Sequence, residues 1–250
     1  MTTPHATAYI DHLTRERRPP NTIAAARRVL RSLPNADTAT REDVEAWWAS
    51  RAHLSPATRS NDLAILRTFY AWCRRWEHRD DDPTLRIDAP KVPRGLPRPM
   101  SRADLTRLLP TLPDDLRRAV CLGAYGGLRV SEAAALTWHD VDLETRRVRV
   151  LGKGGKTRLV GMSPLLLDEL LPDTGGNVVA AGGAPYTAGT LQRKVNRAIR
   201  AAGVDATFHQ LRHRFGTVAL AATGNLLAVS RAMGHASPAT TAIYAATSDA

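Results

Sequence analysis

An eleven-residue segment near the middle of the chain, Ala89-Pro-Lys-Val-Pro-Arg-Gly-Leu-Pro-Arg-Pro99, contains four prolines and has no helical period. Proline fixes its own φ angle and lacks a backbone N–H, so neither a helix nor a central strand can pass through this segment. Fully extended, a segment of this length spans about 35 Å. We therefore predict an extended basic linker over residues 89–99 that separates two domains, 1–88 and 100–250.

Residues 1–88 place apolar side chains at helical spacing in four stretches. Two stretches have start signals: Thr40-Arg-Glu-Asp43 is typical of a capping box, and Ser55-Pro56 supplies an N-cap and a proline at the first helical position. Pro19-Pro20-Asn21 is expected to separate the first two helices. The predicted helices cover residues 7–17, 22–33, 44–52 and 57–77. They predict a small four-helix bundle with most of its aromatic side chains in the core.

Residues 100–250 combine helical periods with a change to a period of two. Residues 147–150 and 157–160 alternate as strands do and flank Gly152-Lys153-Gly154-Gly155, which predicts a β-hairpin. Ser131 is expected to cap a short helix that runs to Leu136. The other predicted helices cover residues 101–109, 114–125, 164–171, 187–202, 207–222, 225–233 and 238–246. The predicted fold class is mainly α with a small antiparallel β-sheet, in which a four-helix N-terminal domain precedes an α+β domain.

Charge and hydropathy limit the partners of the chain. The formal net charge is +11 and the pI is 10.5. Such a surface suits a polyanion, either nucleic acid or an anionic membrane, or a general ribosomal or nucleoid role. No stretch approaches ~18 consecutive apolar residues, the N-terminus has no signal-peptide pattern, and Cys73 and Cys121 stand far apart in sequence. We therefore expect a cytoplasmic protein with no membrane partner.

His209-Gln-Leu-Arg-His213 places two histidines at positions i and i+4 on one helix face, as zinc peptidases do. The position after His209 is Gln210, so the glutamate that acts as general base in those enzymes is missing. Arg212 would also repel a metal ion, and we expect no metal. The alternative is a phosphate site, in which Arg129 and Arg212 each offer a planar guanidinium fork to phosphate oxygens.

Five short motifs follow one another in the second domain. They are Gly127-Leu-Arg129-Val-Ser-Glu132, Gly152-Lys153-Gly154, His209-Gln-Leu-Arg212-His213, Met233-Gly-His235 and Ile243-Tyr244. A single one would be a weak signal, whereas all five in this order and spacing resemble the tyrosine recombinase (phage integrase) family, over essentially the whole chain. The resemblance implies a core-binding (SAM-like) DNA-binding fold for residues 1–88 and the tyrosine recombinase catalytic fold for residues 100–250.

The resemblance also implies a role for each motif in DNA strand cleavage. Tyr244 would attack a phosphodiester, giving a 3′-phosphotyrosine and a free 5′-hydroxyl. Arg129 and Arg212 would bind the phosphate and stabilise its pentacoordinate transition state, a task that a metal performs in many nucleases. Lys153, on its glycine-flanked hairpin, would protonate the leaving 5′-oxygen.

The remaining motif residues would support this reaction. His209 would accept the tyrosine proton or bind the phosphate, and His235 would donate to a non-bridging oxygen. Glu132 would hold the site in place from behind, and His213 would be a supporting residue without a catalytic role. The phosphotyrosine stores the energy of the cut bond, so no nucleotide cofactor is expected, and the chain has no P-loop motif.

By this resemblance the partner is double-stranded DNA with core-type attachment sites, gripped by both domains in the bacterial nucleoid. A tetramer assembled on DNA and a directionality factor are further expected partners. The DNA-contact candidates are basic or polar residues of the linker (Lys91, Arg94, Arg98), the fourth helix (Arg59, Asn61, Arg67) and the stretch after the hairpin (Arg193, Lys194, Arg197).

The two ends of the chain depart from the family pattern. The helical bundle begins almost at Met1, so we expect a minimal form without an arm-type DNA-binding domain. Six residues follow Tyr244, so we expect weak or no docking of a C-terminal tail on a neighbouring subunit.

Several functions share these motifs. Phage integration and excision is the favoured function, with chromosome-dimer or plasmid resolution as the alternative. A type IB topoisomerase-like nicking-closing enzyme uses the same chemistry and reseals the same strand. A DNA-binding relative without catalysis is the fourth possibility, and the intact set of reactive side chains argues against it.

Overall fold

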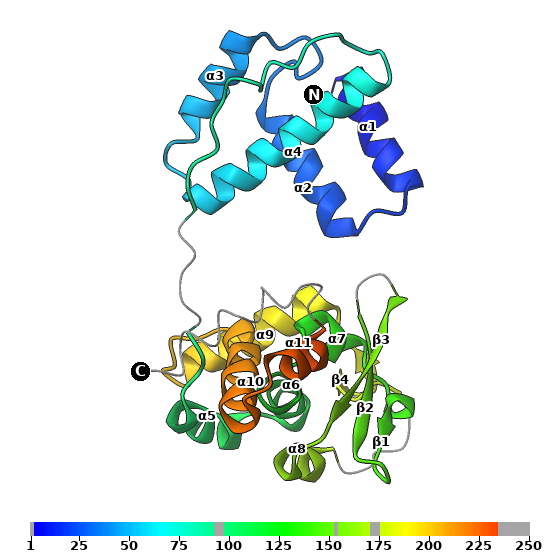
Figure 1. Ribbon diagram of the computed structural model, residues 1–250, viewed down its shortest axis with the longest axis vertical. Helices are drawn as coiled ribbons and strands as arrows, with labels where there is room; N and C mark the ends of the chain where they lie inside the picture. Colours follow the sequence, from blue (N-terminus) through cyan, green and yellow to red (C-terminus); the bar gives the residue numbers. More distant parts are fainter. Residues whose placement is uncertain (1–2, 93–97, 153–154, 171–175, 235–250) are drawn as a thin grey trace. The chain divides into compact units, whose positions relative to one another are not determined.

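The computed structural model describes residues 3–92, 98–152, 155–170 and 176–234 of the chain. The chain folds into two compact units, Met1–Arg94 and Gly95–Ala250 (Figure 1). The boundary between the units falls within the proline-rich segment 89–99. No helix of the described residues combines the length and the apolar character needed to cross a membrane.

The described part of the first unit contains four helices, as the hydrophobic periodicity predicts. They are α1 (Pro4–Arg15), α2 (Pro20–Ser32), α3 (Arg41–Ser50) and α4 (Pro56–Arg75) (Figure 1). The predicted capping signals of α3 and α4 are confirmed: Thr40 and Asp43 form a capping box, and the Ser55 side chain accepts from the Thr58 amide. The prediction for Pro20 is wrong, because Pro20 is the first residue of α2, where the missing N–H has no cost.

Helix α4 supplies much of the core of the first unit. Its Leu63, Leu66, Phe69 and Tyr70 side chains are fully buried, and the Tyr70 hydroxyl donates to a backbone carbonyl of the α2–α3 loop. The aromatic side chains lie mostly in or against this core, as expected, but Trp76 at the end of α4 is 55% exposed. The unit therefore has an apolar core of its own, independent of the second unit.

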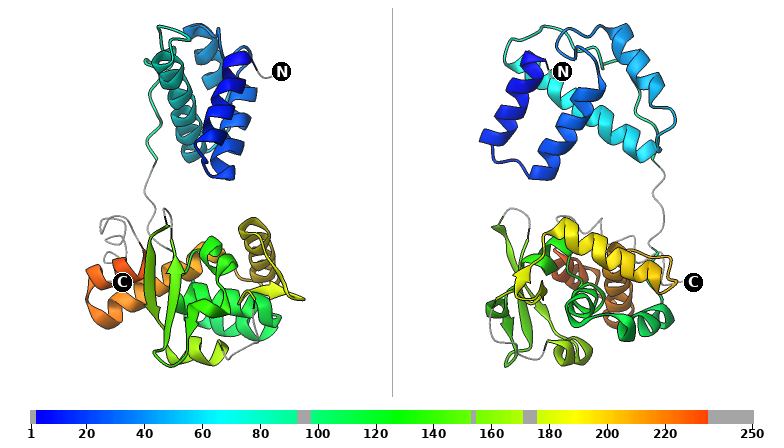
Figure 2. Two further views of the ribbon diagram at one scale, coloured as in Figure 1. Left: turned by 90° about the vertical axis from the view of Figure 1, so that its right-hand side faces the viewer. Right: turned by 180° about the vertical axis from the view of Figure 1, so that it is seen from behind.

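The second unit is built of seven helices with two small sheets among its described residues. The helices are α5 (Arg102–Leu108), α6 (Asp114–Gly126), α7 (Val130–Ala135), α8 (Pro164–Glu169), α9 (Ala188–Ala201), α10 (Phe208–Thr223) and α11 (Leu226–Met233), with 3₁₀ turns at Leu109–Thr111 and Trp138–Asp140. Helix α6 contacts α7, α8, α9 and α10. Figure 1 and Figure 2 show the larger sheet along one side of these helices.

That sheet is antiparallel and has the order β1-β2-β3. Its strands are β1 (Val141–Asp142), β2 (Arg147–Leu151) and β3 (Thr157–Gly161), and a separate pair is formed by β4 (Ala180–Ala181) and β5 (Ala184–Pro185). The predicted hairpin is confirmed, with Val150 opposite Arg158 in its register. The two-residue strands were not predicted because they are too short to show an alternating pattern. The predicted helix over 238–246 lies outside the described residues.

The start of α7 differs from its prediction. Arg129, two residues before Ser131, occupies the N-cap position, and its backbone amide donates to a Glu132 carboxylate oxygen at 2.8 Å. A carboxylate three residues into a helix reaches back to the N-cap amide, so Glu132 and not Ser131 defines where the helix begins. Because α7 begins here, Arg129 lies at the N-terminal end of the helix and not within it.

Gly127 brings the start of α7 close to α10. Its φ angle is +65°, in the left-handed region, and a Cβ at this position would lie 2.4 Å from a ring carbon of Phe215 on α10. Only glycine fits both the backbone conformation and this distance. The close approach places Arg129 beside α10, which carries the histidine motif.

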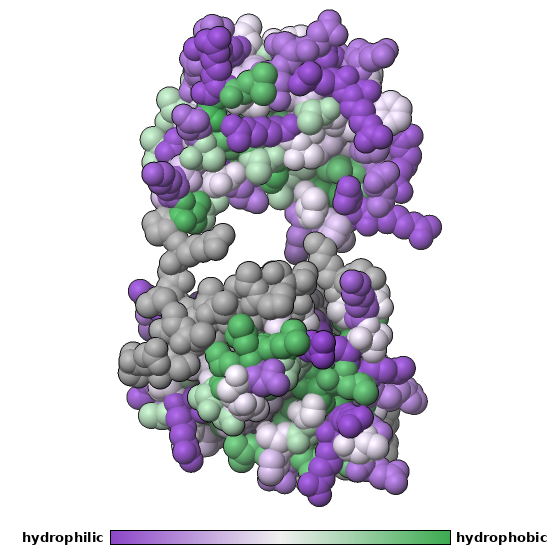
Figure 3. Space-filling view, in the orientation of Figure 1, coloured by the Kyte–Doolittle hydropathy of each residue, from purple (hydrophilic) through white to green (hydrophobic). Residues whose placement is uncertain are grey.

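Helix α11 packs on α10 through a small cluster of its own, formed by Leu220, Val229 and Met233 with Phe215 partly buried against it. Figure 3 shows apolar side chains on the visible face of the second unit over these two helices, where Leu227 is exposed. This packing fixes the C-terminal end of α11 near the start of α7.

Candidate active site

The structure brings Arg129 and Arg212 together, although 83 residues separate them in the sequence. Arg212 projects from α10 and is 2% exposed. Its Nη2 donates to the Met233 carbonyl oxygen at 2.6 Å, and Nη1 of Arg129 donates to the same oxygen at 3.4 Å. The two guanidinium groups therefore lie side by side at the C-terminal end of α11.

The last turn of α11 supplies several oxygens to these groups. Nη2 of Arg129 donates to the Gly234 carbonyl at 2.9 Å, while Nη1 of Arg212 donates back to the Gly127 carbonyl at 2.5 Å. The final carbonyls of a helix have no partner within the helix and carry a partial negative charge, which favours cations there. Gly234 ends the helix in the left-handed conformation, with a φ of +65°.

Glu132 lies behind the two arginines, with its side chain 4% exposed. Its Oε1 accepts from Nη1 of Arg129 at 2.8 Å, and both of its oxygens accept from Arg158 of β3, at 2.9 and 2.8 Å. Nη1 of Arg212 lies 3.9 Å from Oε2. Glu132, Arg129, Arg158 and Arg212 are called the arginine cluster below.

The arginine cluster keeps a positive charge. Burial raises the pKa of Glu132, but the hydrogen bonds from Arg158 and Arg129 outweigh burial and hold this pKa below its ordinary value. Glu132 is therefore ionised at neutral pH, and the cluster has three positive charges against one negative. An environment of this kind favours a phosphate, and favours most a phosphate that gains charge during reaction.

His209 and His213 project from the same helix as Arg212, with ring centroids 4.3 Å apart. Desolvation and the charges of Arg212 and Arg129 lower the pKa of His209. His209 and Arg212 are three positions apart on α10 and so share one face of that helix. His209 is therefore neutral at pH 7 and able to accept a proton.

The described residues contain no group of three His, Cys, Asp or Glu side chains arranged to hold a metal ion. The nearest carboxylate in the cluster, that of Glu132, is engaged by Arg129 and Arg158. The positive charges of Arg212 and Arg129 act at His209 and favour an anion beside it.

Three of the predicted catalytic residues, Lys153, His235 and Tyr244, lie outside the described residues. The residues directly before two of them border the arginine cluster. A Cβ on Gly152 would lie 3.7 Å from Nη1 of Arg158, and one on Gly234 would lie 2.9 Å from the same atom. The described glycines of both motifs therefore border Arg158.

Sequence reasoning missed Arg158. Its signal is the strand alternation: Arg158 and the buried Val160 are two residues apart on β3 and so lie on the same face of the sheet. An arginine on the inward face of a strand needs a buried partner, and Glu132 is that partner.

The predicted DNA-contact residues have varied surroundings. Arg59 stacks on the Trp48 ring at 4.2 Å, and the Arg67 guanidinium donates to the Ile87 carbonyl. Lys194 donates to the Tyr186 hydroxyl at 3.1 Å and so takes part in the fold. The exposed candidates among the described residues are Asn61, Arg67, Lys91, Arg98, Arg193 and Arg197, and Arg94 lies outside them.

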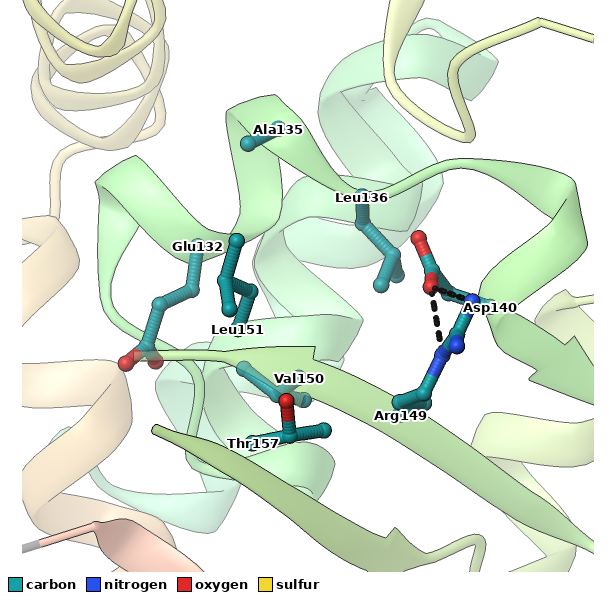
Figure 4. A pocket seen from close by; sticks show the side chains of 8 residues that line it. All are labelled: Glu132, Ala135, Leu136, Asp140, Arg149, Val150, Leu151 and Thr157. Carbon is teal, nitrogen blue, oxygen red and sulfur yellow. Dashed lines mark hydrogen bonds and ion pairs between the residues drawn. The ribbon is translucent and has the colours of Figure 1, made fainter. Parts of the chain in front are cut away.

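A pocket lies between α7 and the β2–β3 hairpin (Figure 4). Glu132 lines it, but the close view shows the Glu132 carboxylate at one end and the Arg149–Asp140 ion pair at the other. Of the arginine cluster, Glu132 is the member that lines this pocket.

His213 gives the second unit a pH-dependent stability. Desolvation, His209 and Arg212 lower the His213 pKa from 6.5 to about 4. The unfolded chain therefore binds a proton more readily than the folded unit, and stability falls as pH drops from about 6.5 toward 4. We expect His213→Gln to show a smaller drop in thermal unfolding midpoint between pH 7 and pH 5 than the unaltered chain, by circular dichroism. Equal drops in the two proteins would contradict this.

Comparisons with known proteins agree with this geometry. The model of the phage integrase family matches residues 100–250. Tyrosine recombinase XerC of Xanthomonas campestris pv. campestris (strain B100) is 35% identical over 209 residues, which cover 78% of this chain and 65% of that protein. Tyrosine recombinase XerD of Xanthomonas axonopodis pv. citri (strain 306) is 37% identical over 225 residues, covering 79% and 74%. The chain thus spans about two thirds of the length of XerC.

A solved structure confirms the fold class. A lambda integrase dimer bound to a COC′ core site matches with a TM-score of 0.79 at 18% identity, covering 96% of this chain and 75% of that one. The mainly α fold with a small antiparallel sheet, predicted from the sequence, is confirmed, and so is the resemblance that the five motifs carry. The chain belongs to the phage integrase family of tyrosine recombinases.

Proposed function

We propose that the chain is a site-specific DNA recombinase that cuts and rejoins strands through a 3′-phosphotyrosine intermediate. The observation that carries the proposal is the meeting of Arg129 and Arg212 at the Met233 carbonyl, beside the ionised Glu132. A phosphodiester carries one negative charge and its pentacoordinate transition state carries two. The net charge of the arginine cluster matches the transition state better than the ground state, as catalysis requires.

In the proposed cleavage step, the Tyr244 oxygen attacks phosphorus while the bond to the 5′-oxygen breaks. His209, neutral at pH 7, takes the phenol proton or binds the phosphate, and Lys153 gives a proton to the leaving 5′-oxygen. His235 donates to a non-bridging oxygen. The reverse attack by a 5′-hydroxyl of another strand restores a phosphodiester, so neither a metal nor a nucleotide is needed.

Each unit has its own part in the proposal. Residues 100–250 perform the chemistry, and residues 1–88 bind core-type sites, with the basic segment 89–99 joining them along double-stranded DNA. Two duplexes are brought together by a tetramer of this chain in the bacterial nucleoid, and a directionality factor sets the outcome. The similarity to integrases solved with DNA supports this assignment.

Two biological roles remain as candidates. Phage integration and excision joins two unlike attachment sites and is the role proposed first. Chromosome-dimer or plasmid resolution joins identical sites and is the second candidate. The similarity to XerC and XerD supports this second role.

A plasmid assay tests the function. Candidate sites are taken from the DNA that flanks the coding region and are cloned into supercoiled plasmids, either as two identical sites or as two unlike sites. The plasmids are incubated with the protein in a buffer that contains EDTA to remove metal ions. We expect products joined between sites, and which pairs react distinguishes integration from resolution. Relaxation without sequence preference would indicate a topoisomerase-like enzyme, and binding without any strand cleavage would indicate a non-catalytic relative.

A further inference from the structure

Arg158 is engaged through all three nitrogens of its guanidinium group, and none of the roles above uses it. Its side chain is 12% exposed, and each of its three nitrogens donates a hydrogen bond. Nη1 and Nη2 bind the two oxygens of Glu132, and Nε donates to the Ala232 carbonyl at 2.7 Å. This fork geometry fixes the Glu132 carboxylate in one orientation.

The orientation of Glu132 matters to the other two arginines. Arg158 occupies both carboxylate oxygens, and Arg212 stays 3.9 Å from Oε2 instead of forming a close ion pair with it. Glu132 already accepts from Arg129 at 2.8 Å, and without Arg158 it would pair closely with Arg212 as well and neutralise more of the positive charge available to a phosphate. The Coulomb interaction is strong there, since Glu132 is almost fully buried.

Arg158 also holds the end of α11. Three successive carbonyls at this end accept hydrogen bonds from the arginines. The Ala232 carbonyl accepts from Arg158, and the Met233 carbonyl accepts from both Arg212 and Arg129. The Gly234 carbonyl accepts from Arg129. Arg158 thus ties α11 to strand β3, and the same helix end orients Arg129 and Arg212. Arg158 can lie this close to the end of α11 because residue 234 is a glycine. A Cβ atom at Gly234 would lie 2.9 Å from Nη1 of Arg158.

We propose that Arg158 is a positioning residue for DNA cleavage: it fixes Glu132 and the end of α11, and through them orients the guanidinium groups of Arg129 and Arg212 toward the scissile phosphate. This proposal rests on the proposed function. Arg158 need not touch DNA, because all three of its nitrogens already bind protein oxygens.

Single-turnover cleavage of a nicked duplex tests the proposal. The covalent adduct is measured for the unaltered chain, Arg158→Met and Arg158→Lys, with DNA affinity measured separately. We expect Arg158→Met to form the adduct about 100-fold more slowly, since small displacements of catalytic groups have effects of this size, while DNA affinity changes less than about twofold. Arg158→Lys keeps the charge without the fork and is expected to lie between.

A second substrate separates positioning from a purely structural role. A methylphosphonate at the scissile linkage replaces one non-bridging oxygen by a methyl group and removes its charge, so its cleavage depends less on the positive charge of Arg129 and Arg212. We expect the ratio of phosphate to methylphosphonate rates to fall about tenfold in Arg158→Met. If Arg158 merely stabilised the fold, both rates would fall by the same factor.

Arg149→Met is the matched control. Arg149 lies on the neighbouring strand β2 and pairs with Asp140 at 2.9 Å, at the far end of the pocket from the Glu132 carboxylate (Figure 4). We expect the Arg149→Met variant to cleave both the phosphate and the methylphosphonate substrate at the rate of the unaltered chain. If Arg158→Met fails to fold, Arg158→Lys decides by the same rate ratio.

Three outcomes would overturn the proposal. The positioning role of Arg158 would be contradicted by an unchanged cleavage rate in Arg158→Met. It would also be contradicted by a loss of rate that is equal on both substrates and follows the folded fraction of the protein. Both results would leave the proposed function intact. No adduct from the unaltered chain would remove the proposed function itself, and the positioning role with it.

Discussion

A chain carrying Tyr244→Phe is expected to bind its DNA site as tightly as the unaltered chain and to form no covalent adduct on a nicked duplex. The substitution removes only the oxygen that would become bonded to phosphorus. Ten residues separate Tyr244 from Gly234, at the arginine cluster, and a chain of this length can extend over about 35 Å. Tyr244 is therefore within reach of the phosphate that Arg129 and Arg212 would hold.

The adduct is measured after denaturing electrophoresis, and peptide mapping of the unaltered protein locates the phosphotyrosine. Tyr125→Phe is the control, since Tyr125 packs partly buried against the core of the second unit and loses the same hydroxyl. It should form the adduct at the normal rate. An adduct in Tyr244→Phe would assign the nucleophile to another residue.

Arg212→Ala is expected to lower the cleavage rate by about three orders of magnitude, or roughly 4 kcal/mol of transition-state stabilisation. The expected loss is large because Arg212 is nearly fully buried and acts where water does not screen its charge. Single-turnover adduct formation measures the rate, and a gel-shift assay measures DNA affinity, which should change far less.

Arg212→Ala also leaves the Gly127 and Met233 carbonyls without their donor, so a loss of stability has to be separated from a loss of catalysis. The thermal midpoint of each variant provides this separation, and rates are compared among fully folded samples. Arg107→Ala serves as control, since Arg107 is exposed and pairs with Asp104 on α5. Cleavage by Arg212→Ala within tenfold of the control would remove Arg212 from the catalytic site.

The sequence predicted much of the fold because its local signals agree with the tertiary structure. The hairpin register follows from strand alternation around the glycines, and α6 ends at Gly126 beside the left-handed Gly127. At the start of α7, where the prediction failed, a side-chain contact decided the outcome. Glu132 sets the start of α7 by reaching back to Arg129, a contact that no local pattern at Ser131 reveals.

The candidate site shows the same limit. The motifs identified Arg129, Arg212 and Glu132, because these residue types recur in a known order. They gave no sign of Arg158, whose role depends on a strand facing a helix 26 residues earlier in the chain. Charge counting also could not distinguish exposed Arg193 from Lys194, which contacts Tyr186 within the fold.

The acceptors that gather the arginines at the end of α11 are main-chain oxygens. A change of side chain at Ala232 or Met233 leaves those oxygens in place as long as the helix keeps its course and its termination. This stretch can therefore vary in composition without loss of the acceptors, provided that position 233 still fills the buried cluster with Leu220 and Val229. Gly234 is the exception, since a larger residue there would meet a neighbouring guanidinium and a backbone conformation that it rarely adopts.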